Sequence, residues 1–214
     1  MMKKQLFPSS FAQVPKPLVM MVKFLVMRKS WLAAMLVIVM LSGCSNKLPN
    51  PDYLSGITNS GKPDFHKLEY EQSGEFHFIL GFGYNARNIL NTFDGTFTKD
   101  LVKGFSTIRF QLSDEQVNLI EEKFRELDIL SYPEEFKPDP VNPKDNTITI
   151  VMPCSSYYIR VELDEQMKEV FWKDENKAYD PKAIALEELI HEIEEMVYER
   201  DEYIKMPKEK GGYE

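Results

Sequence analysis

The chain has 214 residues, of which 43% are hydrophobic and 28% are charged, and its formal net charge is −8. These values describe a mildly acidic globular protein of one or two domains. Nucleic acid is set aside as a partner, because its binding requires clustered Lys and Arg that displace counterions. The two cysteines, Cys44 and Cys154, are too few for a disulfide framework.

Charge is distributed unevenly along the chain. Six Lys and Arg residues and no acidic residue precede Cys44, so the part from Cys44 onward has a formal net charge of −14. Such a charge keeps a domain soluble beside an anionic bilayer. The two parts therefore have different roles.

The basic part contains an uncharged apolar run at residues 31–41, preceded by Arg28 and Lys29. A bilayer-spanning helix needs about 20 apolar residues, whereas a signal-peptide core needs about 7–15. The length favours a signal peptide over a short membrane helix, and residues 1–43 are expected to be removed. Prolines at positions 8, 15 and 17 fit neither a helix nor a signal core, so translation is expected to begin at Met27, or at Met20 or Met21.

Small residues separate the apolar run from the first cysteine. The tetrad Leu41, Ser42, Gly43 and Cys44 resembles the lipobox of bacterial lipoproteins. The resemblance implies that diacylglycerol is attached to the Cys44 sulfur and that the chain is cleaved before this residue. Two or three acyl chains give durable attachment, whereas one gives only marginal binding. The mature protein is thus expected to be lipid-anchored to a bacterial membrane, facing away from the cytoplasm.

Residues 44–63 follow as lipid anchor and flexible tether, since they contain Pro, Gly, Ser and Asn without periodicity. Residues 64–214 are long enough for one domain with its own core. Alternating side chains predict strands at 76–84, 88–93, 96–102 and 108–112, and Asp94-Gly95 predicts a tight hairpin turn with positive φ at both central positions.

The second half of the domain begins with Ser113 and Gln116, which form the capping box of a helix whose apolar stripe continues to Leu127. A proline-containing loop follows, and then strands at 147–152, 157–163 and 168–173. Asp180 as cap and Pro181 at the first position predict a second helix.

The expected fold class is therefore α+β, with a mostly antiparallel β-sheet packed against two α-helices. This order of elements, with the turn Asp94, Gly95 and Thr96 and a capped helix in the middle, looks like small bacterial lipoprotein domains of unknown function. The resemblance covers about Glu75 to Val197. It implies no established activity or site.

Residues 81–86 match the letters of a dinucleotide-binding fingerprint, Gly-X-Gly-X-X-Ala. The context differs, because a strand follows and no crossover helix leads to a parallel partner. We therefore interpret the motif as a turn, and no cofactor is expected.

Cys154 lies between two predicted strands, where a nucleophile can be displayed, and His66, His77 and His191 are the available bases. No local signature of a cysteine hydrolase accompanies it, so an unreactive, partly buried thiol is the favoured interpretation. We interpret His77 and His191 as surface residues.

Two acidic groups invite a metal interpretation. One is the predicted helix set with three- and four-residue spacing: Glu187, Glu188, His191, Glu192 and Glu195. The other is the loop set: Asp139, Asn142, Asp145 and Asn146. The first needs ligands from another element, and the second lacks the spacing and the glycine of a calcium loop. No metal ligand is assigned.

Aromatic residues offer a last candidate site. Tyr157, Tyr158, Phe171 and Trp172 are placed where they would line a groove for a sugar or peptide. For the alternating series from Phe76 to Tyr84 we expect the core between sheet and helices instead. Tyr158 is expected on an exposed strand face, because Arg160 and Glu162 share it.

The sequence thus predicts an envelope lipoprotein whose domain is a binding or accessory module for a protein, peptide or wall component. No catalytic residue is assigned, and an enzyme is the less favoured class. Two alternatives stay open: an envelope-associated hydrolase or other enzyme using Cys154 or carboxylates, and a structural or assembly factor. The expected partners are the membrane, through Cys44, and an envelope protein or peptide.

Overall fold

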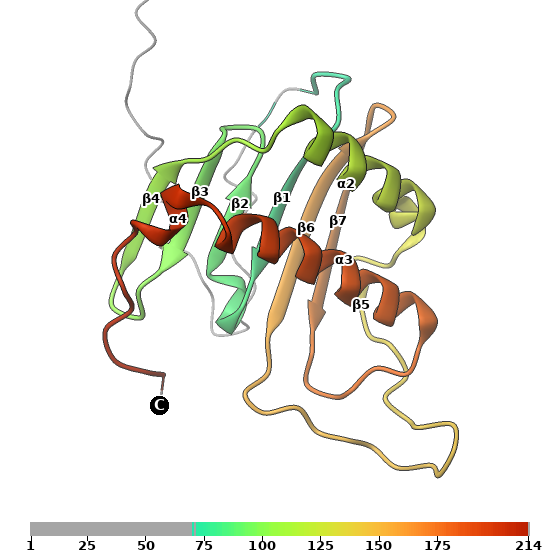
Figure 1. Cartoon of the computed structure of the whole chain (residues 1–214). Coiled ribbons are helices and arrows are strands. Elements are labelled where there is room, and N and C mark those ends of the chain that lie inside the picture. Colours follow the sequence, from blue (N-terminus) through green and yellow to red (C-terminus); the bar gives the residue numbers. More distant parts are fainter. Residues whose placement is uncertain (1–69, 71, 214) are drawn as a thin grey trace, which may run out of the picture. The chain divides into compact units, whose positions relative to one another are not determined.

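The computed structural model describes Tyr70 and residues 72–213, and Figure 1 shows their arrangement. The expected signal peptide, the lipobox and the tether lie outside the described residues. The described part has the predicted α+β fold, in which helices cover one face of a seven-stranded sheet.

The strand order across the sheet is β4-β3-β2-β1-β6-β7-β5. Neighbouring strands pair antiparallel, except that β5 runs parallel to β7. The strand predicted at 108–112 begins earlier, and the one predicted at 147–152 forms only isolated bridges. The strands are β1 (His77–Phe82), β2 (Asn88–Asn91), β3 (Thr96–Asp100), β4 (Phe105–Arg109), β5 (Glu135–Phe136), β6 (Ser156–Leu163) and β7 (Gln166–Lys173).

The two ends of the sheet carry different connections. His77 at the start of β1 pairs with Glu162 near the end of β6, and the β2–β3 and β6–β7 turns lie at this first end. At the other end, the Ser156 amide donates to the Gly83 carbonyl at 2.9 Å. Residues 137–155, which join β5 to β6 there, extend beyond the sheet in yellow and orange in Figure 1. We call this segment the arm.

The β2–β3 hairpin forms, but its turn differs from the prediction. Asn91 pairs with Thr96, so the connection has four residues instead of two. The Asn91 side chain accepts hydrogen bonds from the amides of Phe93 (3.0 Å) and Asp94 (3.4 Å). Because this amide folds the loop, a left-handed conformation is needed at Gly95 (φ +60°) and not also at Asp94.

Both predicted helices begin at the predicted caps. In α2 (Asp114–Glu126), the Ser113 hydroxyl accepts from the Gln116 amide at 3.3 Å, and the Gln116 side chain accepts from the Ser113 amide at 3.0 Å. In α3 (Pro181–Tyr198), the Asp180 carboxylate accepts from the Lys182 amide at 2.8 Å. The remaining helical elements are short: η3 (Tyr84–Ala86), η4 (Ile129–Ser131) and α4 (Asp201–Ile204).

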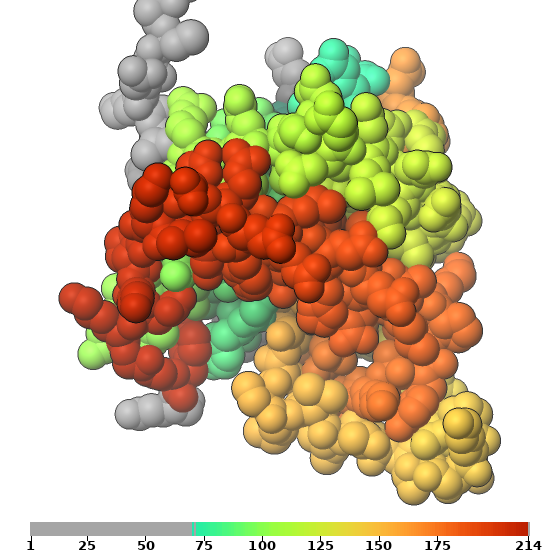
Figure 2. All heavy atoms as spheres, viewed as in Figure 1, coloured from blue at the N-terminus to red at the C-terminus, as the bar shows by residue number. Residues whose placement is uncertain are grey.

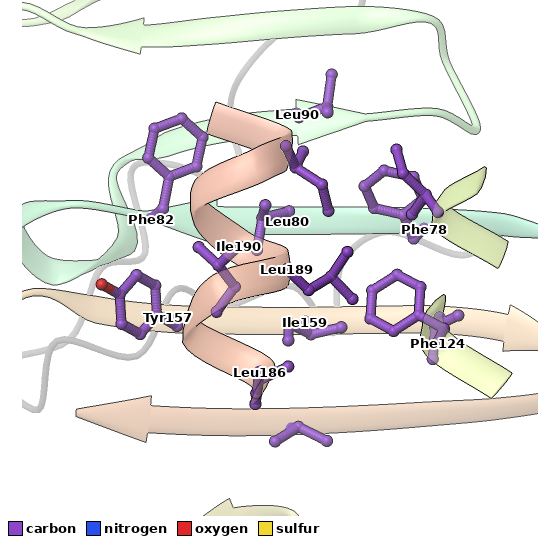
Figure 3. Close-up of a cluster of buried hydrophobic side chains, with 14 of the residues drawn as sticks. Phe78, Leu80, Phe82, Leu90, Phe124, Tyr157, Ile159, Leu186, Leu189 and Ile190 are labelled. Atoms are coloured by element: carbon purple, nitrogen blue, oxygen red, sulfur yellow. The ribbon is translucent and has the colours of Figure 1, made fainter. Parts of the chain in front are cut away.

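The main core lies between the sheet and the two long helices. Figure 3 shows Phe78, Leu80 and Phe82 of β1 pointing toward α3, and each is at most 1% exposed. The core prediction is confirmed for these three residues. The ring of Phe78 also contacts that of Phe124 from α2, with centroids 5.8 Å apart. The buried series ends at Phe82, because Tyr84 is 42% exposed and its ring stacks on that of Tyr213.

The opposite face of the sheet is more buried than predicted. Tyr158 and Glu162 are both 0% exposed, so the expectation of an exposed strand face is wrong. Tyr158 pairs across the sheet with Gly81 on one side and Phe171 on the other. One Glu162 oxygen accepts the Gly74 amide at 2.9 Å, so the chain before β1 reaches this face. The sequence could not reveal this long-range contact.

Candidate functional site

The lipobox residues Leu41, Ser42, Gly43 and Cys44 lie outside the described residues. Within residues 70 and 72–213, no helix is long and apolar enough to cross a membrane. The structure therefore bears on the folded domain alone.

The glycine motif at residues 81–86 is a turn, as we interpreted it. Gly81, the residue before the end of β1, pairs with Tyr158, Gly83 has φ +79°, and the following 3-10 turn leads into β2, which pairs antiparallel with β1. A Cβ on Gly81 would lie only 3.0 Å from the Ala86 carbonyl oxygen, which explains the glycine. The dinucleotide-binding fingerprint opens an α-helix whose N-terminus faces the phosphate, whereas here a three-residue 3-10 turn leads into β2.

Cys154 is half-buried at the end of the arm. No hydrogen bond to its thiol is found among the described residues. His77 pairs at the first end of the sheet, about six residues or 20 Å along β6 from the arm. His191 is on α3 and contacts carboxylates, while His66 lies outside the described residues. No hydrogen bond joins Cys154 to His77 or His191, the two described histidines.

The acidic residues of α3 that were considered as metal ligands make separate contacts. Glu192 forms an ion pair with Lys123 of α2 at 2.9 Å, which ties the two helices together. The His191 ring contacts Glu187 at 3.8 Å and Glu194 at 3.6 Å. The part of the chain that the structure describes contains no group of three or more His, Cys, Asp or Glu arranged to hold a metal ion.

Sequence reasoning missed a carboxylate environment beneath α3. Burial raises the pKa of Asp174 at the end of β7, and the Glu187 charge raises it further. Burial also raises the pKa of Glu194, while the neighbouring His191 lowers it. Asp174 comes from a different element and follows a strand without any motif, so no local signal indicated its burial beside the helix.

The polar loop set folds the arm. Asp139 accepts the Val141 amide at 2.9 Å, Asn142 accepts the Lys144 amide at 3.0 Å, and Asp145 accepts the Thr147 amide at 3.1 Å. Each is a side chain capping the backbone two residues onward, which is the usual role of Asp and Asn in turns. These oxygens therefore shape a hairpin, whose bridge pairs Val141 with Ile148.

The returning half of the arm lies along the segment after β7. The Val151 amide donates to the Glu175 carbonyl at 2.9 Å, and the Lys177 amide donates to the Thr149 carbonyl at 2.9 Å. A bridge pairs Ile150 with Asn176. The predicted strand at 147–152 therefore exists as an extended segment that is paired along one edge.

This extended segment exposes large apolar side chains. Ile148, Ile150 and Met152 are 55%, 71% and 84% exposed, and Val141 opposite Ile148 is 37% exposed. Residues at alternate positions of an extended chain share one face, so the four form a continuous apolar stripe. We call it the arm stripe. Figure 2 shows the arm in gold, projecting beyond the helices at one end of the molecule.

A pocket of about 490 Å³ lies where the arm leaves the sheet. Its walls combine aromatic rings, prolines and two lysines paired with neighbouring glutamates, Lys137 with Glu135 and Lys173 with Glu175. The predicted aromatic groove is only partly formed, because Tyr157 and Trp172 belong to the core while Tyr158 lies on the other face. The pocket is lined by Glu135, Phe136, Lys137, Pro138, Pro140, Phe171, Trp172, Lys173, Glu175 and Asn176.

The arm also differs from the domain in charge. Residues 137–155 contain Lys137, Lys144, Asp139 and Asp145 and are neutral, whereas the chain from Cys44 onward carries −14. The arm stripe, the pocket and this local neutrality together make the arm the best candidate site for binding another molecule.

Comparisons with protein-family models, with curated proteins and with solved structures find no match to this chain.

Proposed function

We propose that this chain is a bacterial lipoprotein, anchored through Cys44 to a membrane and facing away from the cytoplasm, whose domain binds other envelope polypeptides through the arm. The arm stripe carries the proposal. Its four side chains form a contiguous exposed apolar patch, and such patches often mark binding sites on soluble domains. The anchor rests on the lipobox resemblance of residues 41–44.

The position of the arm supports this role. Tyr70, 26 residues after Cys44, is held at the first end of the sheet, where its hydroxyl donates to Asp94 at 2.6 Å and its ring stacks on Phe93. The arm leaves the opposite end. The length of β6, eight residues or about 26 Å, separates the two ends. Tyr70 and the arm therefore lie at opposite ends of the sheet.

The anchor is tested by the mass of the mature protein. Wild type is expected to lack residues 1–43 and to carry the mass of attached acyl chains, and Cys44→Ala is expected to remain unprocessed and unlipidated. An uncleaved, unlipidated wild type would overturn the anchor.

Binding through the arm is tested by placing a photo-crosslinking amino acid at Ile150 in the full chain, expressed in bacteria. Discrete crosslinked species are expected on irradiation. Ile204 of α4 is the matched control, since it is 65% exposed and lies away from the arm. If Ile150 gives no more crosslinking than Ile204, the arm is not a binding surface and the proposed function fails.

A further inference from the structure

The segment after α4 lies against the sheet through its side chains. We call residues 207–213 the tail; all of them are exposed, and none belongs to a helix or strand. Among the described residues, the only backbone hydrogen bond of the tail runs from the Lys210 amide to the Leu101 carbonyl at 3.5 Å. Figure 1 shows the tail in dark red, running from α4 toward the end of the sheet from which the arm leaves.

The aromatic ring of the tail has two partners on the sheet. The ring of Tyr213 stacks on that of Tyr84 in η3, with centroids 3.8 Å apart. The Arg87 guanidinium lies 5.7 Å from the centre of the Tyr213 ring and 4.5 Å from that of Phe105. An aromatic ring and a cation both interact favourably with a π-system, so this place suits a flat aromatic group.

The hydroxyl of Tyr213 meets a carboxylate that the domain holds in place. The Asp100 amide donates to the Asn88 side chain at 3.0 Å, and Asp100 Oδ1 accepts the Val102 amide at 3.0 Å. The Arg87 Nε is 3.2 Å from the same oxygen, and the Asp100 side chain is only 8% exposed. The other oxygen, Oδ2, accepts the hydroxyl of Tyr213. The domain thus presents one fixed acceptor for a phenol.

A buried cation beside this carboxylate meets a second residue of the tail. The Lys99 side chain is also 8% exposed, and its ammonium is 2.9 Å from the Glu209 carboxylate. A buried charge is costly unless it is paired. Lys99 and Asp100 therefore match a segment that carries a carboxylate and, four residues later, a phenol.

We propose that this end of the sheet is a binding site for a tyrosine-bearing segment of another polypeptide, and that the tail is its displaceable occupant. The site, which we call the tyrosine site, consists of Tyr84, Arg87, Lys99 and Asp100. The inference goes beyond the proposed function, because no residue of the arm contributes to it.

The way the tail is attached favours displacement. Its release breaks no helix or strand of the described residues, and Gly211 and Gly212 next to Tyr213 let the backbone turn away. A tethered occupant competes at an effective concentration of roughly millimolar. The tail therefore excludes weak ligands and gives way to a segment that binds more tightly.

Displacement is tested with the full-length lipoprotein in detergent and a fluorescent synthetic peptide of residues 207–214. Tyr213→Ala removes the ring of the tail, and because Tyr213 is 39% exposed the domain is expected to stay folded, which a urea titration checks. By fluorescence anisotropy, Tyr213→Ala is expected to bind the peptide at least tenfold more tightly than wild type, whose own tail competes.

Two further changes identify the contacts. Phenylalanine in place of the peptide tyrosine removes the hydroxyl that Asp100 accepts and is expected to weaken binding at least fivefold. Tyr84→Ala, added to Tyr213→Ala, removes the stacking ring and is expected to weaken binding by a similar factor. Leu119→Ala is the matched control, because Leu119 is equally 42% exposed but lies on α2, and it should leave binding within about twofold.

Equal peptide affinities of wild type and Tyr213→Ala would overturn the inference, since the tail would not occupy the place where the peptide binds. Binding that Tyr84→Ala leaves unchanged would overturn it as well, because the peptide would then bind elsewhere. Equal binding of the tyrosine and phenylalanine peptides would remove Asp100 from the site and with it the selection for a phenol. None of these results bears on the arm, which crosslinking at Ile150 tests separately.

Discussion

The central strand and the arm carry the same sequence pattern with opposite outcomes. In β1, the apolar residues Phe78, Leu80 and Phe82 alternate and are at most 1% exposed. In the arm, Ile148, Ile150 and Met152 alternate in the same way but are 55–84% exposed. Alternation indicates which side chains share a face, and it does not say what covers that face. In β1 the cover is α3, whereas the arm extends beyond the helices (Figure 1).

This difference predicts that the two regions contribute differently to stability. Phe78→Ala is expected to lower the free energy of unfolding by about 3–5 kcal/mol, because the buried ring leaves a cavity beside Phe124. Urea titration followed by fluorescence measures it, with Trp172, 2% exposed, as the probe. A loss below about 1 kcal/mol would show that the region around Phe78 is loosely packed.

The loss of a helix cap is expected to have the next largest effect on the free energy of unfolding. Ser113→Ala removes one side of the capping box of α2 and is expected to cost about 1 kcal/mol. Ser113→Thr keeps the hydroxyl and serves as the control. Equal losses in both variants would mean that the hydrogen bond to the Gln116 amide contributes nothing.

These caps show which parts of the fold the sequence reveals. Short-range patterns predicted both helix starts and most strands, because the caps and the alternation involve residues within about four positions. The two-residue turn was wrong because the side chain of Asn91, outside the turn, determines the loop. Buried Tyr158 and Glu162, and the burial of Asp174 beside α3, depend on contacts between distant segments.

The arm was only partly predictable for the same reason. Its apolar alternation indicated a strand at 147–152, and its Asp and Asn residues indicated polar turns. That the segment pairs along one edge and stays open on the other depends on Glu175 and Lys177, which follow β7. The candidate site is therefore a tertiary feature that local sequence patterns do not specify.

A smaller effect is expected at the boundary between the two regions, where β7 ends. Burial raises the pKa of Asp174, so its stabilising contribution is present below its ordinary pKa, roughly 4, and is lost as pH rises through the folded value. Asp174→Asn mimics the protonated form. It is expected to be more stable than wild type near neutral pH and to converge with it in acid.

A carboxylate with the opposite shift provides the control. Hydrogen bonds from Arg125 lower the pKa of Asp164, whose contribution is present above its ordinary pKa and lost as pH falls through the folded value. Asp164→Asn is therefore expected to be less stable than wild type near neutral pH. If both variants change stability in the same direction across the titration, burial is not the cause at Asp174.

The smallest effect is expected in the arm. Ile150→Ser exchanges a side chain that is 71% exposed, so the free energy of unfolding should stay within about 0.5 kcal/mol of wild type. A loss above about 1 kcal/mol would mean that the arm stripe packs on its own domain. The decisive observation combines two measurements at one position. If Ile150→Ser leaves unfolding unchanged while a photo-crosslinker at Ile150 gives discrete crosslinked species, then Ile150 acts between molecules, whereas Phe78 at an equivalent alternating position acts within one.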